Sequence, residues 1–176
     1  MRKTTLFKAL SIVSLCALSF SAFAETELAS PYQISYQAPA WKLANKQQDP
    51  DGYTFQYQPA NAQKHFESIT VNYGKGIQSS LKDSMQQVVS EMNTTGCQTR
   101  ESSILKEDTK TLVFKTVLDQ CTNGKSLTQI FKVFNTPDGQ YSIVYSVDSV
   151  MHANKSPDKM ESIIESAKLT PTKQHS

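Results

Sequence analysis

The sequence CQTRESSILKEDTKTLVFKTVLDQC, from Cys97 to Cys121, contains the clearest structural signal in the chain. Two runs with the composition of β-strands flank a polar turn centred on Thr109. When the two runs are paired antiparallel about this turn, Ile104 lies opposite Phe114 and Cys97 lies opposite Cys121. The sequence therefore predicts a β-hairpin whose open end is joined by a disulfide.

The first 24 residues have the features of an export signal. A basic start at Arg2 and Lys3 precedes an apolar stretch and the small-residue cleavage site Ala22-Phe23-Ala24. The apolar stretch is shorter than the ~20 residues that a membrane-spanning helix needs. We therefore expect cleavage after Ala24, a periplasmic or secreted protein, and no stable membrane insertion of the mature chain. Lipid attachment at Cys16 is the alternative.

Removal of this segment changes the charge of the chain. The whole sequence has a formal net charge of +2, and the segment contains Arg2, Lys3 and Lys8 but no acidic residue, so the mature chain has a net charge of −1. No block of basic residues remains that would favour a nucleic acid or an anionic membrane as the partner. We therefore expect no nucleic-acid partner.

The mature chain keeps two cysteines, Cys97 and Cys121. A pair of cysteines in an exported protein favours a disulfide, which is rare in the cytosol. Two separate thiols are the alternative. A redox-active pair is disfavoured because the C-x-x-C spacing that tunes such thiols is absent.

The periodicity of the mature chain predicts one domain over residues 25–170, followed by a disordered tail at 171–176. Alternation of apolar and polar residues predicts three strands before a helix at 80–93. The Cys97–Cys121 hairpin follows, and the Asn123-Gly124 turn joins it to two further strands. A second helix is predicted to begin near Ser156. The predicted order is βββ-α-ββββ-α.

The strands of the hairpin and those after it carry apolar residues on both faces. Leu112, Phe114 and Leu118 alternate with Val113 and Val117. A sheet that is covered on both sides explains this pattern better than a sheet with one face in water. The predicted fold class is therefore α+β, with an antiparallel sheet covered by helices on both faces in an α/β/α sandwich.

One family resemblance follows from this order. Tyr32-Gln-Ile-Ser-Tyr36, followed by Pro39 and Trp41, is similar to the opening strand and turn of the PsbP/Mog1-like fold, which includes bacterial exported proteins of the DcrB type. The later strands, the single central helix and the closing helix resemble that fold in topology and spacing. The resemblance implies a non-enzymatic module that binds or assembles with other proteins in an exported compartment.

Few residues of the chain have a pattern typical of a functional site. Gly74-Lys75-Gly76, between a strand and a helix, could contact an anionic ligand, or simply form a turn. Trp41, beside Pro39, is a candidate partner contact, or covers an edge of the sheet. None of His65, His152 and His175 has a second histidine or a cysteine at metal-ligand spacing. We expect no metal and no cofactor.

Three functions are compatible with these observations. The first is an exported, non-enzymatic binding or assembly module acting through protein or small-ligand contacts. The second is a secreted effector of a bacterial pathogen, which the sequence does not separate from the first. The third is a small exported hydrolase, which would need His65 or His152 within hydrogen-bond distance of a nucleophile. The sequence favours a non-enzymatic protein.

Overall fold

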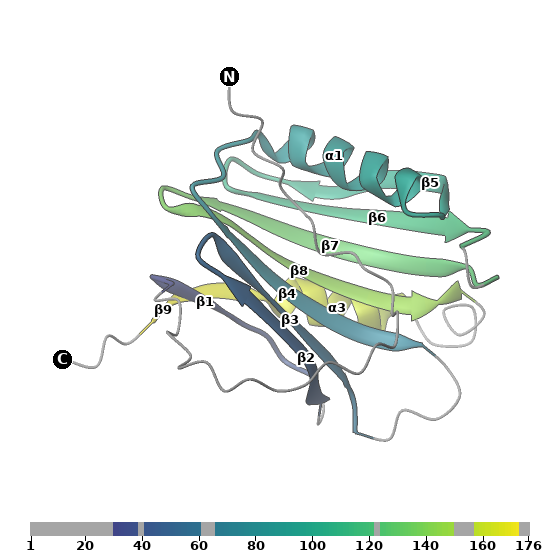
Figure 1. Ribbon diagram of the computed structural model, residues 1–176, viewed down its shortest axis with the longest axis horizontal. Helices are drawn as coiled ribbons and strands as arrows, with labels where there is room; N and C mark the ends of the chain where they lie inside the picture. The colour runs from purple at the N-terminus through teal and green to yellow at the C-terminus, as the bar shows by residue number, and fades with distance from the viewer. Residues whose placement is uncertain (1–29, 39–40, 61–65, 122–123, 150–156, 173–176) are drawn as a thin grey trace.

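A computed structural model describes residues 30–38, 41–60, 66–121, 124–149 and 157–172 of the chain. The predicted export signal and the three histidines lie outside these residues. Most of the described chain forms one antiparallel sheet of seven strands in the order β2-β3-β4-β8-β7-β6-β5 (Figure 1). The strands are β2 (Trp41–Asp49), β3 (Gly52–Pro59), β4 (Glu67–Lys75), β5 (Gln98–Glu107), β6 (Thr111–Asp119), β7 (Leu127–Thr136) and β8 (Gly139–Asp148).

One face of this sheet packs against α1 (Leu81–Thr94). The helix begins at the N-cap Ser80, whose hydroxyl accepts a hydrogen bond from the backbone N–H of Asp83. Leu81 and Met92 of the helix join Phe114 and other buried side chains of β6, β7 and β8 in one apolar cluster. The helix therefore covers the sheet mainly over β5, β6 and β7.

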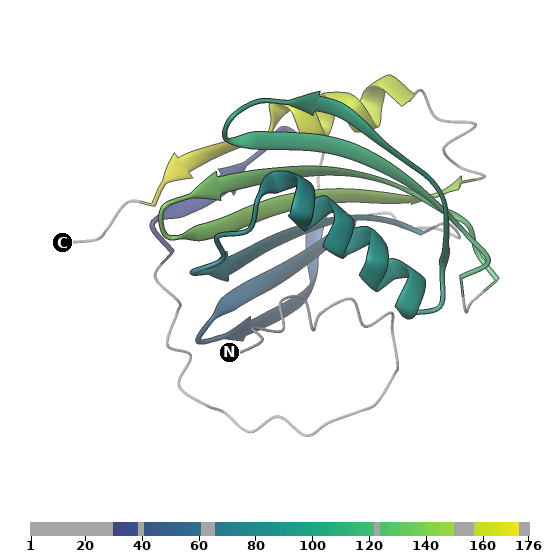
Figure 2. The ribbon, with the colours of Figure 1, turned by 90° about the horizontal axis from the view of Figure 1, so that it is seen from above.

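The opposite face packs against α3 (Pro157–Ser166) and against a two-stranded ribbon of β1 (Tyr32–Ser35) and β9 (Lys168–Pro171). Met160, Ile163 and Ile164 of α3 are buried on the side chains of β7 and β8. Seen from above, the strongly curved sheet separates α3 and the ribbon from α1 (Figure 2).

The predicted α/β/α sandwich is wrong, because the protein is mostly β: strands account for 58% of the structure and helices for 18%. Buried residues do lie on both faces of the strands, so both faces of the sheet are covered. Their cover is not two layers of helices, because the β1–β9 ribbon supplies part of it and, among the residues that the structure describes, one helix packs on each face. Two strands are also absent from the predicted order, β2 and β9.

The predicted hairpin is present as β5 and β6, and its pairing of Ile104 with Phe114 is confirmed. The edge strand β5 contains two bulges, between Thr99 and Glu101 and between Ile104 and Lys106. A bulge inserts an unpaired residue and twists an edge away from further pairing.

The next hairpin has a different register from the one predicted. A two-residue turn at Asn123-Gly124 would set Phe114 opposite Val133, whereas the structure sets Phe114 opposite Phe131. The connection is longer because β6 and β7 stop pairing at Leu118 and Leu127. The N–H of Cys121 and the carbonyl of Lys125 form a hydrogen bond within this connection.

The β1–β9 ribbon holds the start of the described domain against its end. The backbone N–H of Thr172 donates to the carbonyl of Pro31, and the Tyr32 ring packs edge-on against Tyr141 of the main sheet. The chain is thus ordered through Thr172, and residues 173–176 of the predicted tail lie outside the described part.

Candidate functional site

Trp41, predicted as a candidate partner contact, lies at the start of β2 opposite Pro59. Its ring packs edge-on against Tyr145, with 5.9 Å between the ring centroids, and it joins the apolar cluster on the α3 face. Tyr145 is fully buried and donates a hydrogen bond to Glu67. Trp41 therefore packs over a buried tyrosine of β8, and its role as a partner contact stays a prediction.

Gly74-Lys75-Gly76 lies at the C-terminal end of β4, whereas Glu67 is at its start. The N–H of Lys75 donates to the carbonyl of Asp51, and the N–H of Gly76 donates to the carbonyl of Asp138, both at 2.7 Å. These two hydrogen bonds join the end of β4 to the β2–β3 turn and to the β7–β8 turn. The two N–H groups are therefore not directed to a ligand. A Cβ at Gly139 would lie 2.2 Å from the carbonyl oxygen of Gly74, so this junction requires glycine.

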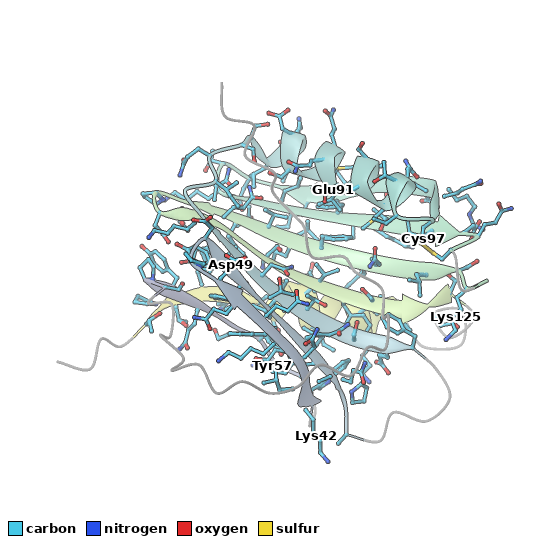
Figure 3. All side chains as sticks on the ribbon, in the orientation of Figure 1. Lys42, Asp49, Tyr57, Glu91, Cys97 and Lys125 are labelled. Atoms are coloured by element: carbon cyan, nitrogen blue, oxygen red, sulfur yellow. A yellow bond between two sulfur atoms is a disulfide. The ribbon has the colours of Figure 1, made fainter. Side chains whose placement is uncertain are left out.

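The structure joins Cys97 and Cys121 by a disulfide, with 2.06 Å between the sulfur atoms. Both residues are buried beside the end of α1. Cys97 and Lys42, the neighbour of Trp41, lie at distant corners of the molecule (Figure 3). The predicted site residues are therefore not brought together in one place.

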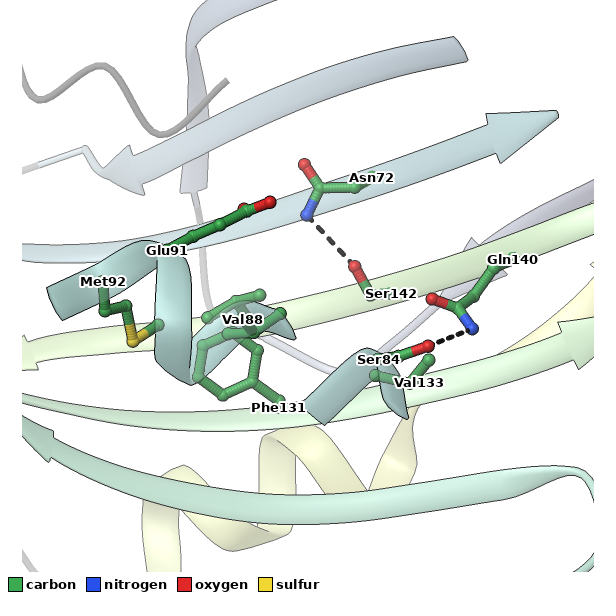
Figure 4. Close-up of a pocket in the computed structure, with 10 residues that line it drawn as sticks. Asn72, Ser84, Val88, Glu91, Met92, Phe131, Val133, Gln140 and Ser142 are labelled. Atoms are coloured by element: carbon green, nitrogen blue, oxygen red, sulfur yellow. Dashed lines mark hydrogen bonds between the residues drawn. The ribbon is translucent and has the colours of Figure 1, made fainter. Parts of the chain in front are cut away.

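A cleft separates α1 from the face of β4, β7 and β8 that it partly covers (Figure 4). We call it the α1 cleft. Its volume is about 30 Å³, which is room for a water molecule but not for a larger ligand. Its walls are formed by Asn72, Ser84, Val88, Glu91, Met92, Phe131, Val133, Gln140, Ser142 and Val144.

The polar groups of the α1 cleft are mostly bonded to one another. The Asn72 amide donates to the Ser142 hydroxyl at 3.1 Å, and the Gln140 amide donates to the Ser84 hydroxyl at 2.8 Å. Burial raises the pKa of Glu91, and the hydrogen bond from Gln87 partly offsets this rise. The hydroxyls of Ser84 and Ser142 contact side-chain amides, a backbone carbonyl and a further hydroxyl, and none of these groups is a base that could activate them.

A second cavity is large enough for a small ligand. It lies between the turn that joins β5 to β6 and the junction of α3 with β9, and its volume is about 290 Å³. Ligand sites in proteins begin at about 300 Å³. We call it the lysine pocket. It is lined by Lys106, Asp108, Thr111, Val113, Lys132, Phe134, Glu165, Ala167, Lys168 and Leu169.

Lys132 is the most buried of the three lysines in this pocket. Its Nζ donates to the carbonyl oxygens of Glu165 at 3.1 Å and Ala167 at 2.8 Å, which are at the C-terminal end of α3. The same atom lies 5.4 Å from the centre of the Phe134 ring. An ammonium group has three donors, so one remains for a ligand.

The other charges of the lysine pocket are at its rim. Lys106 and Lys168 are exposed and form no ion pair within the described residues. The carboxylate of Asp108 accepts hydrogen bonds from its own turn, from the N–H groups of Lys110 and Thr111 and from the Thr111 hydroxyl. With Glu165 as the second acid, three lysines and two carboxylates give the pocket a formal charge of +1.

Sequence reasoning missed the lysine pocket. One signal was present: Lys132 interrupts the apolar side of β7 between Ile130 and Phe134, where the alternation predicts a buried apolar residue. Lys106 and Lys168 gave no signal, because an exposed lysine on a strand is ordinary. Only the fold brings the three lysines together.

The described residues contain no group of three or more histidine, cysteine, aspartate or glutamate side chains that could hold a metal ion. Neither described helix has the length and apolar character needed to cross a membrane.

No protein-family model matches the sequence, and no curated protein matches it. Among solved structures, the fold is similar to the crystal structure of LpqN, which is involved in cell envelope biogenesis of Mycobacterium tuberculosis. The TM-score is 0.49 and the sequence identity is 17%, over 80% of this chain and 84% of that chain. The resemblance to the PsbP/Mog1-like fold stays a prediction.

Proposed function

We propose that this chain is an exported, non-enzymatic binding module and that its ligand occupies the lysine pocket. The observation that carries the proposal is the pocket itself, with a volume of about 290 Å³, an apolar floor and a charged rim. Ligand sites typically combine an apolar lining with a few convergent polar groups. The α1 cleft is about one tenth of this size and its polar groups are already paired.

Export rests on the predicted signal over residues 1–24 and on the cysteine pair. A buried disulfide between Cys97 and Cys121 fits a protein that folds outside the reducing cytosol. Membership of the PsbP/Mog1-like group, with the DcrB-type exported proteins, is part of the same proposal. A secreted effector would differ from this proposal in where the protein acts, but not in its binding site. Measuring the amount of the protein in the periplasm and in the culture medium therefore distinguishes the two functions.

A binding role is favoured over hydrolysis by the groups that line the lysine pocket. Its only hydroxyl group is that of Thr111, which donates to the carboxylate of Asp108 in an exposed turn. An exposed carboxylate has a low pKa and is a weak general base, and hydrogen bonds from Thr111 and Lys110 hold the pKa of Asp108 lower still. The hydrolase hypothesis needs either His65 or His152, and both lie outside the described residues.

The proposal is tested by saturation-transfer NMR with two probes that share an eight-carbon chain, octanoate and 1-octanol. We expect at least one probe to receive magnetisation from the protein. Val113→Phe adds volume inside the lysine pocket and should abolish the signal, while Val88→Phe, the same change in the α1 cleft, should leave it. Circular dichroism checks that both variants are folded. Saturation transfer to neither probe, or loss of the signal only in Val88→Phe, would overturn the proposal.

A further inference from the structure

We propose that the ligand of the lysine pocket is an amphiphilic anion, with one singly charged headgroup, such as a carboxylate or a phosphodiester, on an apolar chain. This inference rests on the proposed function and specifies the chemistry of the same site.

The rim supplies the binding groups for the headgroup. The ammonium groups of Lys106 and Lys168 are exposed at the rim, and Lys132 has one donor left after its two bonds to α3 carbonyls. The three ammonium groups repel one another, and the two carboxylates of the lining offset this repulsion only in part. An anion between them would relieve this repulsion.

The surroundings of Lys132 change the pKa of its ammonium group. Burial first, and then the positive charge of Lys106, lower its pKa from the usual lysine value. Lys168 acts in the same direction, whereas Glu165 and Asp108 act in the opposite one. A bound anion would act in the same direction as Glu165 and Asp108, and so would favour the charged form of Lys132.

The acids of the pocket limit the charge of the ligand. Asp108 directs its carboxylate to the backbone of its own turn, which leaves Glu165 as the acid most able to repel an anion. The formal charge of the whole lining is +1, so a headgroup with a single negative charge neutralises it. A highly charged ligand, such as a polyphosphate, would leave an excess of negative charge.

The floor of the pocket supplies the site for the apolar chain. Val113 and Phe134 are 5% exposed, and Ala167 is fully buried. Together with the partly buried Leu169 of β9 they give the pocket an apolar lining, most of which is already packed inside the protein. Apolar surface removed from water contributes about 25 cal/mol per Å². Because the floor is already mostly buried, the gain comes mainly from the apolar chain of the ligand itself. A bare inorganic anion lacks this chain, so the pocket favours an anion that carries one.

Isothermal titration calorimetry with three probes separates these contributions. Octanoate has the headgroup and the chain, 1-octanol has the chain alone, and inorganic phosphate has the charge alone. We expect octanoate to bind about tenfold more tightly than 1-octanol, because a charge pair adds to the same burial. We expect phosphate to bind about tenfold more weakly than octanoate, because it buries no apolar area. The affinity for octanoate should fall as salt is added, since the rim lysines are exposed.

Substitutions at the rim test the same inference without disturbing the core. Lys106→Gln and Lys168→Gln should each weaken octanoate binding about threefold, and together about tenfold. Glu165→Gln removes the repelling acid and should tighten binding about threefold. Lys42→Gln is the matched control, because Lys42 lies on β2 at the far edge of the sheet (Figure 3). None of these variants should change the affinity for 1-octanol.

The possible failures are distinct. Equal affinity for octanoate and 1-octanol, with no effect of the lysine substitutions, would overturn the anionic headgroup but leave the proposed function standing. Phosphate binding as tightly as octanoate would show that an apolar chain does not contribute to binding, and would overturn that part of the inference. No binding of any probe, together with the absence of saturation transfer, would overturn the proposed function itself.

Discussion

The ammonium group of Lys132 lies 2.8 Å from the carbonyl oxygen of Ala167 and so ties β7 to the junction between α3 and β9. The carbonyl groups at the end of a helix have no partner within the helix, and a cation there interacts favourably with the helix dipole. One side chain therefore forms part of the lysine pocket and also holds one of its walls in place.

Lys132→Met removes this contact while keeping most of the apolar side chain. Two carbonyl groups lose their donor, so we expect the free energy of unfolding to fall by about 2 kcal/mol in urea denaturation. Lys115→Met is the control, because Lys115 is a partly buried lysine on the neighbouring strand β6. Hydrogen exchange should also become faster in α3 and β9. Equal stability of the two variants would show that Lys132 does not hold the helix end.

Asp138 should make the protein sensitive to acid. Burial alone would raise its pKa, but hydrogen bonds from the hydroxyls of Thr136, Tyr141 and Tyr73 outweigh burial and lower the pKa from its usual value of 3.8. A lowered folded-state pKa stabilises the protein above the unfolded-state value, and this stability is lost as the pH falls through the folded-state value.

Asp138→Asn should therefore be less stable than the wild type at pH 7 and should approach it at pH 2. Urea denaturation across this range measures the difference. A difference that stays constant with pH would show that the charge of Asp138 has no role. Asp83→Asn is a control, because Asp83 is an exposed acid in the first turn of α1.

Glu91 should have the opposite effect on stability. Its pKa is raised, chiefly by burial, so the folded protein binds a proton more readily than the unfolded chain does. Stability should therefore fall as the pH rises from the unfolded-state pKa through the folded-state one. Glu91→Gln should flatten this dependence and be the more stable protein at pH 7. If the wild type is instead more stable than Glu91→Gln at pH 7, the hydrogen bond from Gln87 outweighs the cost of burying the carboxylate, and the prediction is wrong.

The disulfide should contribute a large share of the stability. It closes a separation of 24 residues between Cys97 and Cys121, for which the chain-entropy model gives about 3 to 4 kcal/mol. A Cys97→Ser, Cys121→Ser double variant should unfold at a correspondingly lower urea concentration. Mass analysis of the wild-type protein should find it lighter by the mass of two hydrogens before reduction. Free thiols in protein purified from the periplasm would contradict both this prediction and the export proposal.

The elements that sequence reasoning recovered are those with strong local periodicity. The helix predicted at 80–93 is α1 (Leu81–Thr94), where an N-cap serine precedes a stripe of apolar residues. The β5–β6 hairpin was found because its turn and the two cysteines specify the same pairing.

The parts that were missed depend on tertiary contacts. β2 is polar and largely exposed, so it has no alternation to detect, and it forms because it pairs with β3. β9 has only four residues and depends on β1, more than 130 residues earlier. The lysine pocket combines side chains from β5, β6, β7, α3 and β9, which no local pattern connects.

The most direct test of the binding proposal is an amide chemical-shift map of the ¹⁵N-labelled mature protein during titration with octanoate. We predict that the largest shifts occur at Val113, Phe134, Ala167 and Leu169, which form the floor of the lysine pocket, and that they saturate. Saturating shifts centred on Val88, Phe131 and Ser142 would place the ligand in the α1 cleft, and the absence of saturating shifts would mean that the pocket binds no such ligand. Either result would contradict the assignment of the lysine pocket as the binding site.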